Sequence, residues 1–121
     1  LSLDLGQVEV IARVTLNGKK CGTAWKPPYR VDITNAIQPG RNELQVEVAN
    51  TWVNRMIGDE YLPPHASWKD WEILLEWPEW FKEGKSSPAK HFTFTSARHY
   101  TRDSRVEPAG LLGPVKIIEQ N

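Results

Sequence analysis

The sequence predicts an all-β protein built from antiparallel strands. Apolar and polar residues alternate along several short segments in the first half of the chain, which is typical of strands with one buried face. The pairs Asn17-Gly18 and Pro39-Gly40 separate these segments, and both pairs favour tight reversals of the chain. A chain that reverses between alternating segments pairs neighbouring strands antiparallel.

The first predicted strand covers residues 8–17. One face carries only apolar side chains, namely Val8, Val10, Ala12, Val14 and Leu16. Ile11 is the one misfit, because it lies on the polar face. Asn17-Gly18 is the strongest short-range hairpin signal, since both residues tolerate the positive φ of a type I′ turn. Residues 19–25 are therefore expected to return as the partner strand.

The next strands follow a segment that cannot belong to a central strand. Residues 26–28 (Lys-Pro-Pro) lack two ladder donors, because proline has no N–H. Alternation resumes at residues 29–34. Residues 38–41 (Gln-Pro-Gly-Arg) predict a type II turn, and residues 44–48 form a further strand with one polar face.

The middle of the chain differs in composition and in hydrophobic pattern. Five of the six tryptophans lie between Trp52 and Trp80, and the alternation disappears there. We expect a long, mostly irregular excursion at about residues 59–91 with one short helix, which Ser67 would cap and Pro78 would end. The side chains that would share one helix face are Trp68, Trp71, Leu74 and Leu75.

Regular strands should return after the excursion. Residues 91–96 would form one strand, with Phe92 and Phe94 inward. Residues 114–119 would form the last strand, with Val115 and Ile117 inward.

Length and composition favour a single domain over residues 1–121. Fifteen basic and fifteen acidic residues cancel, so nothing indicates a nucleic-acid or membrane partner. No apolar run approaches the roughly 20 residues of a membrane-spanning helix, and the start does not resemble a signal peptide. The chain begins with leucine, which suggests a fragment of a larger multidomain polypeptide. A single cysteine, Cys21, excludes an internal disulfide and a zinc site built on several thiolates.

Several motifs resemble known families. Residues 14–22 (Val-Thr-Leu-Asn-Gly-Lys-Lys-Cys-Gly), 29–34 and 39–48 resemble the jelly-roll, galactose-binding-like domain that accompanies glycoside hydrolase family 2 enzymes. Residues 50–59 (Asn-Thr-Trp-Val-Asn-Arg-Met-Ile-Gly-Asp) and 109–115 (Ala-Gly-Leu-Leu-Gly-Pro-Val) resemble the end of large α-L-rhamnosidase-like enzymes of family 106. The resemblance covers nearly the whole chain; it is strongest from Val8 to Asp59 and from Phe92 to Ile117, and weak from Tyr61 to Ala89.

This resemblance implies a C-terminal β-sandwich, the jelly roll of a sugar-binding domain, beside a separate catalytic domain of the same polypeptide. It also implies a role in polysaccharide degradation and a periplasmic or extracellular location. The domain would be an accessory that contacts carbohydrate. The alternative is a purely structural module that packs on the catalytic domain and has no affinity for free sugar.

Candidate carbohydrate contacts are aromatic. A flat apolar ring can stack on the C–H face of a sugar, and neighbouring polar groups can bind the hydroxyls. The candidates are Trp77, Trp80, Trp25 and His99. The alternative is structural, with the tryptophans sealing the excursion and the histidine satisfied by its neighbours.

A second group follows the strand at residues 44–48, where binding residues of a sandwich often lie. It consists of Trp52, Asn54, Arg55 and Asp59. These residues would contact the catalytic domain, or Arg55 and Asp59 would form an ion pair that fastens the excursion.

Catalysis by this chain itself is not expected. Glycoside hydrolysis needs two carboxylates that face each other across a pocket at roughly 5 to 9.5 Å, whereas Asp59 and Glu60 are adjacent and would point apart. The parent protein would be the glycoside hydrolase. No cofactor is expected, although Asp32 or Asp59 with loop carbonyls could hold a structural calcium ion.

Overall fold

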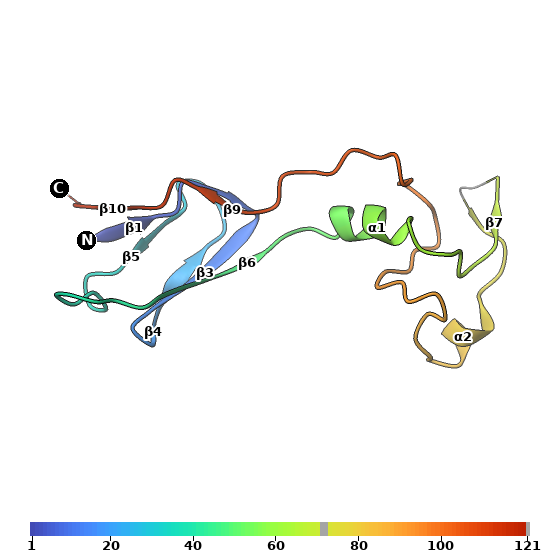
Figure 1. Ribbon diagram of the computed structural model, residues 1–121, viewed down its shortest axis with the longest axis horizontal. Coiled ribbons are helices and arrows are strands. Elements are labelled where there is room, and N and C mark those ends of the chain that lie inside the picture. The colour runs from blue at the N-terminus through green and yellow to red at the C-terminus, as the bar shows by residue number, and fades with distance from the viewer. Residues whose placement is uncertain (71–72, 121) are drawn as a thin grey trace. The chain divides into compact units, whose positions relative to one another are not determined.

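A computed structural model of the protein describes residues 1–70 and 73–120 (Figure 1). The chain divides into two compact units. We call Leu1–Thr51 with Pro108–Asn121 the strand unit, and Trp52–Glu107 the insert unit. The excursion expected at residues 59–91 lies inside the insert unit, which begins earlier and ends later. The assignment of a single domain stays a prediction.

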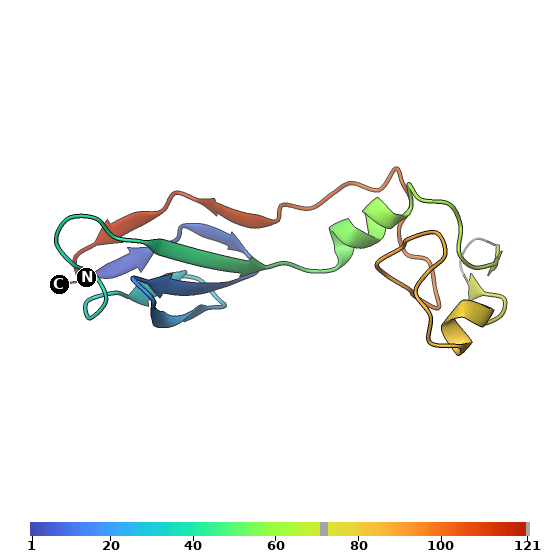
Figure 2. The ribbon, with the colours of Figure 1, turned by 60° about the horizontal axis from the view of Figure 1, so that its bottom comes forward.

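The strand unit contains antiparallel strands, which Figure 2 shows side by side. They are β1 (Ser2–Asp4), β2 (Gln7–Glu9), β3 (Ile11–Leu16), β4 (Lys19–Ala24), β5 (Arg30–Asp32), β6 (Leu44–Ala49), β9 (Gly110–Gly113) and β10 (Lys116–Ile118). The strand orders are β10-β1-β5, β2-β9 and β4-β3-β6. The prediction of an all-β, antiparallel fold is confirmed.

The predicted first strand is divided in two. β2 pairs with β9, whereas β3 lies between β4 and β6. The predicted inward face is nevertheless correct, because Val8, Val14 and Leu16 are buried. Ile11, the misfit of the pattern, is 42% exposed. Alternation therefore predicted which side chains form the core, although a change of pairing partner interrupts the strand.

The core of the strand unit is aliphatic and continuous. Its buried members are Leu3, Leu5, Val8, Ala12, Val14, Leu16, Ala24, Val31 and Ile33. Removal of this apolar surface from water is the main favourable contribution to folding of the unit.

Both predicted turns are present. Asn17 and Gly18 have φ of 51° and 77°, the positive values that a type I′ hairpin requires. Gly40 has φ of 83°, as the third position of a type II turn requires. The Asn17 side chain also donates to the Ala36 carbonyl at 2.9 Å, so the hairpin is tied to the loop that follows β5.

The C-terminal segment departs from the prediction. β9 was not anticipated, and β10 is shorter than the predicted strand at residues 114–119. Val115 and Ile117 are 41% and 57% exposed rather than buried. Ile117 lies opposite the buried Leu3 across the β1–β10 ladder. β10 is at the edge of its sheet, where no further strand among the described residues covers that side chain.

The insert unit has short elements. They are α1 (Val53–Asp59), β7 (Trp68–Lys69), β8 (Ile73–Leu74) and α2 (Glu79–Lys82). The helix predicted to start near Ser67 is wrong, because β7 pairs with β8 there; Trp71 of that prediction lies outside the described residues. Pro78 does not end a helix but precedes α2. Its φ of −61° suits a helix start, where the missing N–H costs nothing.

The strand predicted at residues 91–96 is also absent from the described structure. Phe92 is 71% exposed rather than inward. The N–H groups of Phe92 and Thr93 donate to the carboxylate of Asp59 instead of to a neighbouring strand. A buried carboxylate thus competes with ladder formation at this position. Within residues 1–70 and 73–120, no helix has the length and apolar character needed to cross a membrane.

Candidate functional site

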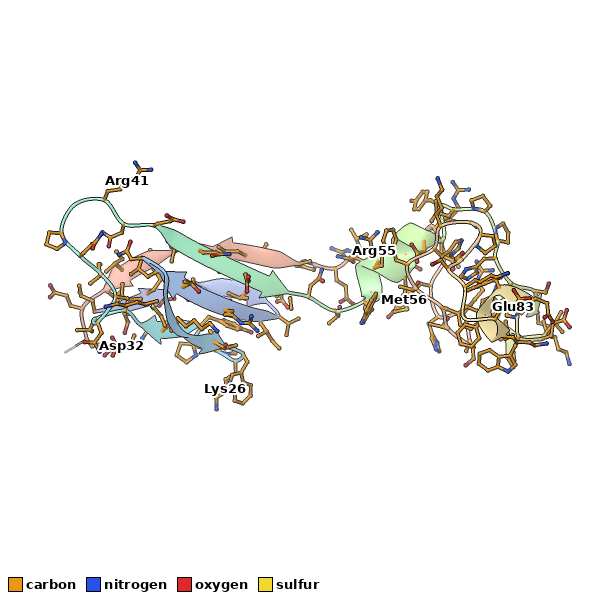
Figure 3. All side chains as sticks on the ribbon, turned by 90° about the horizontal axis from the view of Figure 1, so that it is seen from below. Lys26, Asp32, Arg41, Arg55, Met56 and Glu83 are labelled. Carbon is orange, nitrogen blue, oxygen red and sulfur yellow. The ribbon has the colours of Figure 1, made fainter. Side chains whose placement is uncertain are left out.

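Asp59 anchors the insert unit. It is only 3% exposed, and one carboxylate oxygen accepts from the Phe92 N–H at 2.9 Å, the Thr93 N–H at 2.7 Å and the Thr93 hydroxyl at 2.8 Å. The guanidinium of Arg55, labelled in Figure 3, lies 4.2 Å from the centre of the Phe92 ring. Asp59 therefore fastens the excursion through residues 92 and 93, not through the ion pair considered with Arg55.

Asn54 joins the two ends of the insert unit. Its amide donates to the Glu107 carbonyl at 2.8 Å and accepts from the Glu107 N–H at 2.8 Å. Such a reciprocal pair satisfies two backbone groups with one side chain. Trp52, at the start of the unit, is 66% exposed. A contact of this group with a catalytic domain stays a prediction.

Six aromatic rings form a cluster within the insert unit. The cluster contains His65, Trp77, Trp80, Phe81, His91 and Phe94. Trp80 is half-buried, and its indole N–H donates to the His65 carbonyl at 2.8 Å. Trp77 stacks on Phe81 with ring centres 5.1 Å apart and keeps 48% exposure. Both tryptophans are thus part of the packing of the insert unit, as the structural alternative expects.

His65 and His91 stack with ring centres 3.8 Å apart. His65 Nδ1 lies 2.9 Å from the Ser87 hydroxyl, and His91 Nε2 donates to the Pro63 carbonyl at 2.6 Å. Burial, followed by the neighbouring His91, lowers the pKa of His65 to about 4, while Asp59 acts weakly in the opposite direction. His65 is therefore neutral at physiological pH.

The insert unit also contains a hollow of about 1100 Å³. Its lining comes from the end of α1 and from residues 61–70 and 91–103; it includes Glu60, Tyr61, Trp68, Arg98, His99, Tyr100, Arg102 and Asp103. His99, predicted as a sugar contact, is exposed and lines this hollow. The other three predicted contacts do not line this hollow: Trp77 and Trp80 are in the aromatic cluster of the insert unit, and Trp25 is in the strand unit.

Two cation–aromatic pairs order the lining of the hollow. Glu60 forms an ion pair with Arg98, whose guanidinium lies 6.0 Å from the centre of the Trp68 ring. The Tyr61 hydroxyl donates to the Arg102 carbonyl at 2.8 Å, and the Arg102 guanidinium lies 5.0 Å from the Tyr61 ring centre. The spacing of these residues matches no regular motif, so their grouping around one hollow could not be predicted from the sequence.

Trp25 belongs to the strand unit, on the segment that follows β4. Its ring is 63% exposed, and the Lys26 ammonium lies 5.0 Å from the ring centre. Figure 3 shows Lys26 pointing away from the strands. An exposed ring beside a cation is available to a ligand, but no concave surface is described around it.

No metal site is evident within the described residues, where no group of three or more ligating side chains converges. Asp32 accepts from the Thr34 hydroxyl at 2.6 Å and from the Thr34 N–H at 2.8 Å. These hydrogen bonds, the hydroxyl first, lower the pKa of Asp32. Asp59 is equally occupied by donors. The suggested calcium site stays a prediction without a ligand set.

Three comparisons with known proteins place the chain. The family described as glycosyl hydrolase 2 galactose-binding domain-like matches residues 1–72. A protein from Formosa agariphila, provisionally named beta-glucuronidase, is 46% identical over 117 residues, which cover 97% of this chain and 10% of that protein. The rhamnosidase from Novosphingobium sp. PP1Y superposes with a TM-score of 0.67 at 38% identity, covering 94% of this chain and 8% of that one.

The chain spans only a tenth or less of either protein. The matches confirm the resemblance drawn from the turn-flanked motifs, including its rhamnosidase side. More than half of the chain fits the family, and the antiparallel strand unit lies within the matched region except for its last two strands. The chain belongs to the glycosyl hydrolase 2 galactose-binding domain-like family.

Proposed function

We propose that this chain is a non-catalytic, carbohydrate-binding-like accessory domain of an α-L-rhamnosidase-like glycoside hydrolase, which packs on or supports a separate catalytic domain during polysaccharide degradation. Family membership and the small share of each relative that the chain matches support this role. The proposed location is periplasmic or extracellular, where polysaccharides are met.

One observation carries the packing role. The C-terminal part of the strand unit exposes a run of large apolar side chains, namely Leu111, Leu112, Val115 and Ile117, each at least 41% exposed. Four such side chains within seven residues are more than the scattered apolar surface of an ordinary monomer. Interfaces between domains of one polypeptide have this character.

A purely structural module remains the second candidate. It is favoured by Trp80, which is half-buried among other rings and whose indole N–H already donates to the His65 carbonyl. Both candidates share the packing role and differ only in affinity for carbohydrate.

A chimera tests the packing role. The matching segment of the Novosphingobium rhamnosidase is replaced by this chain, and Ile117→Asp is introduced both into the chimera and into the 121-residue chain. Because Ile117 is 57% exposed, the substitution should leave the thermal unfolding midpoint of the chain alone almost unchanged. In the chimera it should lower that midpoint by several degrees, since a charge would be buried at the interface.

Arg41→Asp is the control, because Arg41 is exposed on the loop before β6 (Figure 3). It should affect neither protein. The packing role would be contradicted if Ile117→Asp left the unfolding midpoint unchanged in the chimera as well as in the 121-residue chain. Hydrolysis of an aryl rhamnoside or an aryl glucuronide by the 121-residue chain alone would contradict the non-catalytic assignment.

A further inference from the structure

We propose that the hollow of the insert unit is a binding site for a neutral saccharide unit. The site would lie on residues 52–107 and not on the strand unit that defines the family. This inference deepens the proposed accessory function and rests on it. It moves the sugar contact from the tryptophans to the surroundings of the Glu60–Arg98 ion pair.

The hollow is large enough for such a ligand. Its volume of about 1100 Å³ is slightly above the range of roughly 300 to 1000 Å³ that is common for small-molecule sites. One sugar ring with part of its neighbour would fit.

The lining offers what a polyhydroxylated ring needs. Sugar hydroxyls both donate and accept, so a site for them combines strong acceptors with strong donors, beside apolar rings for the C–H face. The lining contains both acceptors and donors, together with three aromatic side chains. The members are Glu60, Asp70 and Asp103, then Arg98, His99 and Arg102, then Tyr61, Trp68 and Tyr100.

Part of the lining is held in place. The Glu60 and Arg98 side chains are only 22% and 18% exposed, and they pair with each other while Arg98 also lies over Trp68. Tyr61 and Arg102 are joined by a hydrogen bond and by a cation–aromatic contact. Side chains that are already fixed lose little conformational entropy when a ligand binds, which raises affinity.

The charges favour a neutral sugar over a uronic acid. The lining carries carboxylates at Asp59, Glu60, Asp70 and Asp103, against guanidinium groups at Arg98 and Arg102. Arg98 is already engaged by Glu60. An anionic sugar would therefore meet an excess of negative charge, whereas neutral hydroxyls would find acceptors.

The hollow extends beyond the part of the chain that matches the family. The family match ends at residue 72, and nine of the twenty lining residues come from residues 91–103. The matches to the Formosa protein and to the Novosphingobium rhamnosidase cover 97% and 94% of the chain, so they include most of the insert unit. The region that forms the hollow is therefore largely covered by both matches.

The test is an amide NMR titration of the 121-residue chain with L-rhamnose, D-galactose and D-glucuronate. At least one neutral sugar should shift amide signals within residues 60–70 and 91–103, with a dissociation constant of the order of 1 mM. Signals of the strand unit should not move. Glucuronate should bind more weakly than the best neutral sugar.

Two substitutions at exposed positions of the lining sharpen the test. Asp103→Asn removes the negative charge of a carboxylate, and His99→Ala removes an imidazole, and both side chains are exposed. Together they should weaken binding about tenfold, because a hydrogen bond to a charged group is lost. Glu83→Gln is the matched control, since Glu83 is exposed in the same unit but outside the lining (Figure 3). It should leave the affinity unchanged.

Three results would overturn the inference. They are no shift with any of the three sugars at concentrations up to about 100 mM, shifts confined to the surroundings of Trp25 or Trp77, and binding of glucuronate alone. None of these results would change the outcome of the chimera experiment, because that experiment measures the effect of Ile117 in the strand unit. Failure of this site and failure of the accessory role are therefore distinguishable.

Discussion

The strand unit and the insert unit are stabilised in different ways. Nine apolar residues are buried in the core of the strand unit. Among the described residues of the insert unit, Ile57 is the one apolar side chain buried to that degree, and it lies on α1 two residues before the buried Asp59. The strand unit depends on apolar burial, whereas the insert unit depends on a few polar anchors and on stacked rings. Substitutions should therefore act by different mechanisms in the two units.

Leu5→Ala should have the largest effect. Leu5 is fully buried in the aliphatic core, so truncation loses transfer free energy and leaves a cavity. The free energy of unfolding should fall by about 3 to 4 kcal/mol, measured by urea denaturation with a probe in β3. Leu111→Ala is the control, because Leu111 is 41% exposed, and its cost should be about 1 kcal/mol or less. Equal costs at both positions would contradict the core described here.

Asp59→Ala tests the anchor of the insert unit. The substitution leaves three donors on residues 92 and 93 without their acceptor. The cost should be about 2 to 4 kcal/mol, because buried donors that lose their partner pay for desolvation. Amide hydrogen exchange of Phe92 and Thr93 reports the loss directly. Glu76→Ala, at an exposed acidic residue of the same unit, is the control. Unchanged exchange at residues 92 and 93 would show that the anchor contributes little.

This contrast explains how much of the fold could be predicted from the sequence. Alternation and turn residues are local signals, so Val8, Val14 and the Asn17-Gly18 hairpin were predicted correctly. Asp59 bonds to residues more than thirty positions away, and no local pattern encodes that pairing. The predicted strand at residues 91–96 failed for this reason. Its backbone donors serve Asp59 instead of a ladder.

The candidate site was predicted less well than the fold. His99 was identified from its residue type, and the structure places it at the hollow. Glu60 and Arg98 form their ion pair across 38 residues, so their partnership is visible only after folding. Trp80 was predicted as a carbohydrate contact, a role that needs a ring face open to the ligand. Its ring is instead half-buried, and its indole N–H donates a hydrogen bond to the His65 carbonyl. Buried tryptophans usually have such a hydrogen-bond partner.

Gly6→Ala tests a close backbone approach within the strand unit. A Cβ at this position would lie 2.4 Å from the carbonyl carbon of Gly113, and Gly6 has φ of +68°. The cost should be about 2 to 3 kcal/mol, combining steric overlap with backbone strain. Gly18→Ala is the matched control, since Gly18 also has positive φ but nothing within 4 Å of the added atom. The difference between the unfolding free energies of Gly6→Ala and Gly18→Ala measures the cost of the steric overlap with Gly113. Equal free energies would contradict the close approach.

Acidification should act mainly on the insert unit, through His65. Its pKa is lowered in the folded chain to about 4, whereas an imidazole in the unfolded chain titrates near 6.5. The unfolded state therefore binds more protons between these values, and stability falls as the pH drops from about 6.5 to 4. The effect should stay below the full linkage value, because the ring is only partly buried. His65→Gln should flatten this slope in thermal denaturation measured from pH 7 to 4, and an unchanged slope would assign it to other groups.

Trp25→Ala should have the smallest effect. Trp25 is 63% exposed, and its described partner is the Lys26 ammonium 5.0 Å from the ring centre. An exposed cation–aromatic contact contributes about 0.5 to 1 kcal/mol, so the unfolding midpoint should move by only a few degrees. The sugar titration should be unaffected, because the proposed site lies on the insert unit. A tenfold loss of sugar affinity in Trp25→Ala would instead assign carbohydrate recognition to the strand unit and leave the hollow with no role in it. This weakest structural perturbation is thus the one that decides which unit carries the sugar contact.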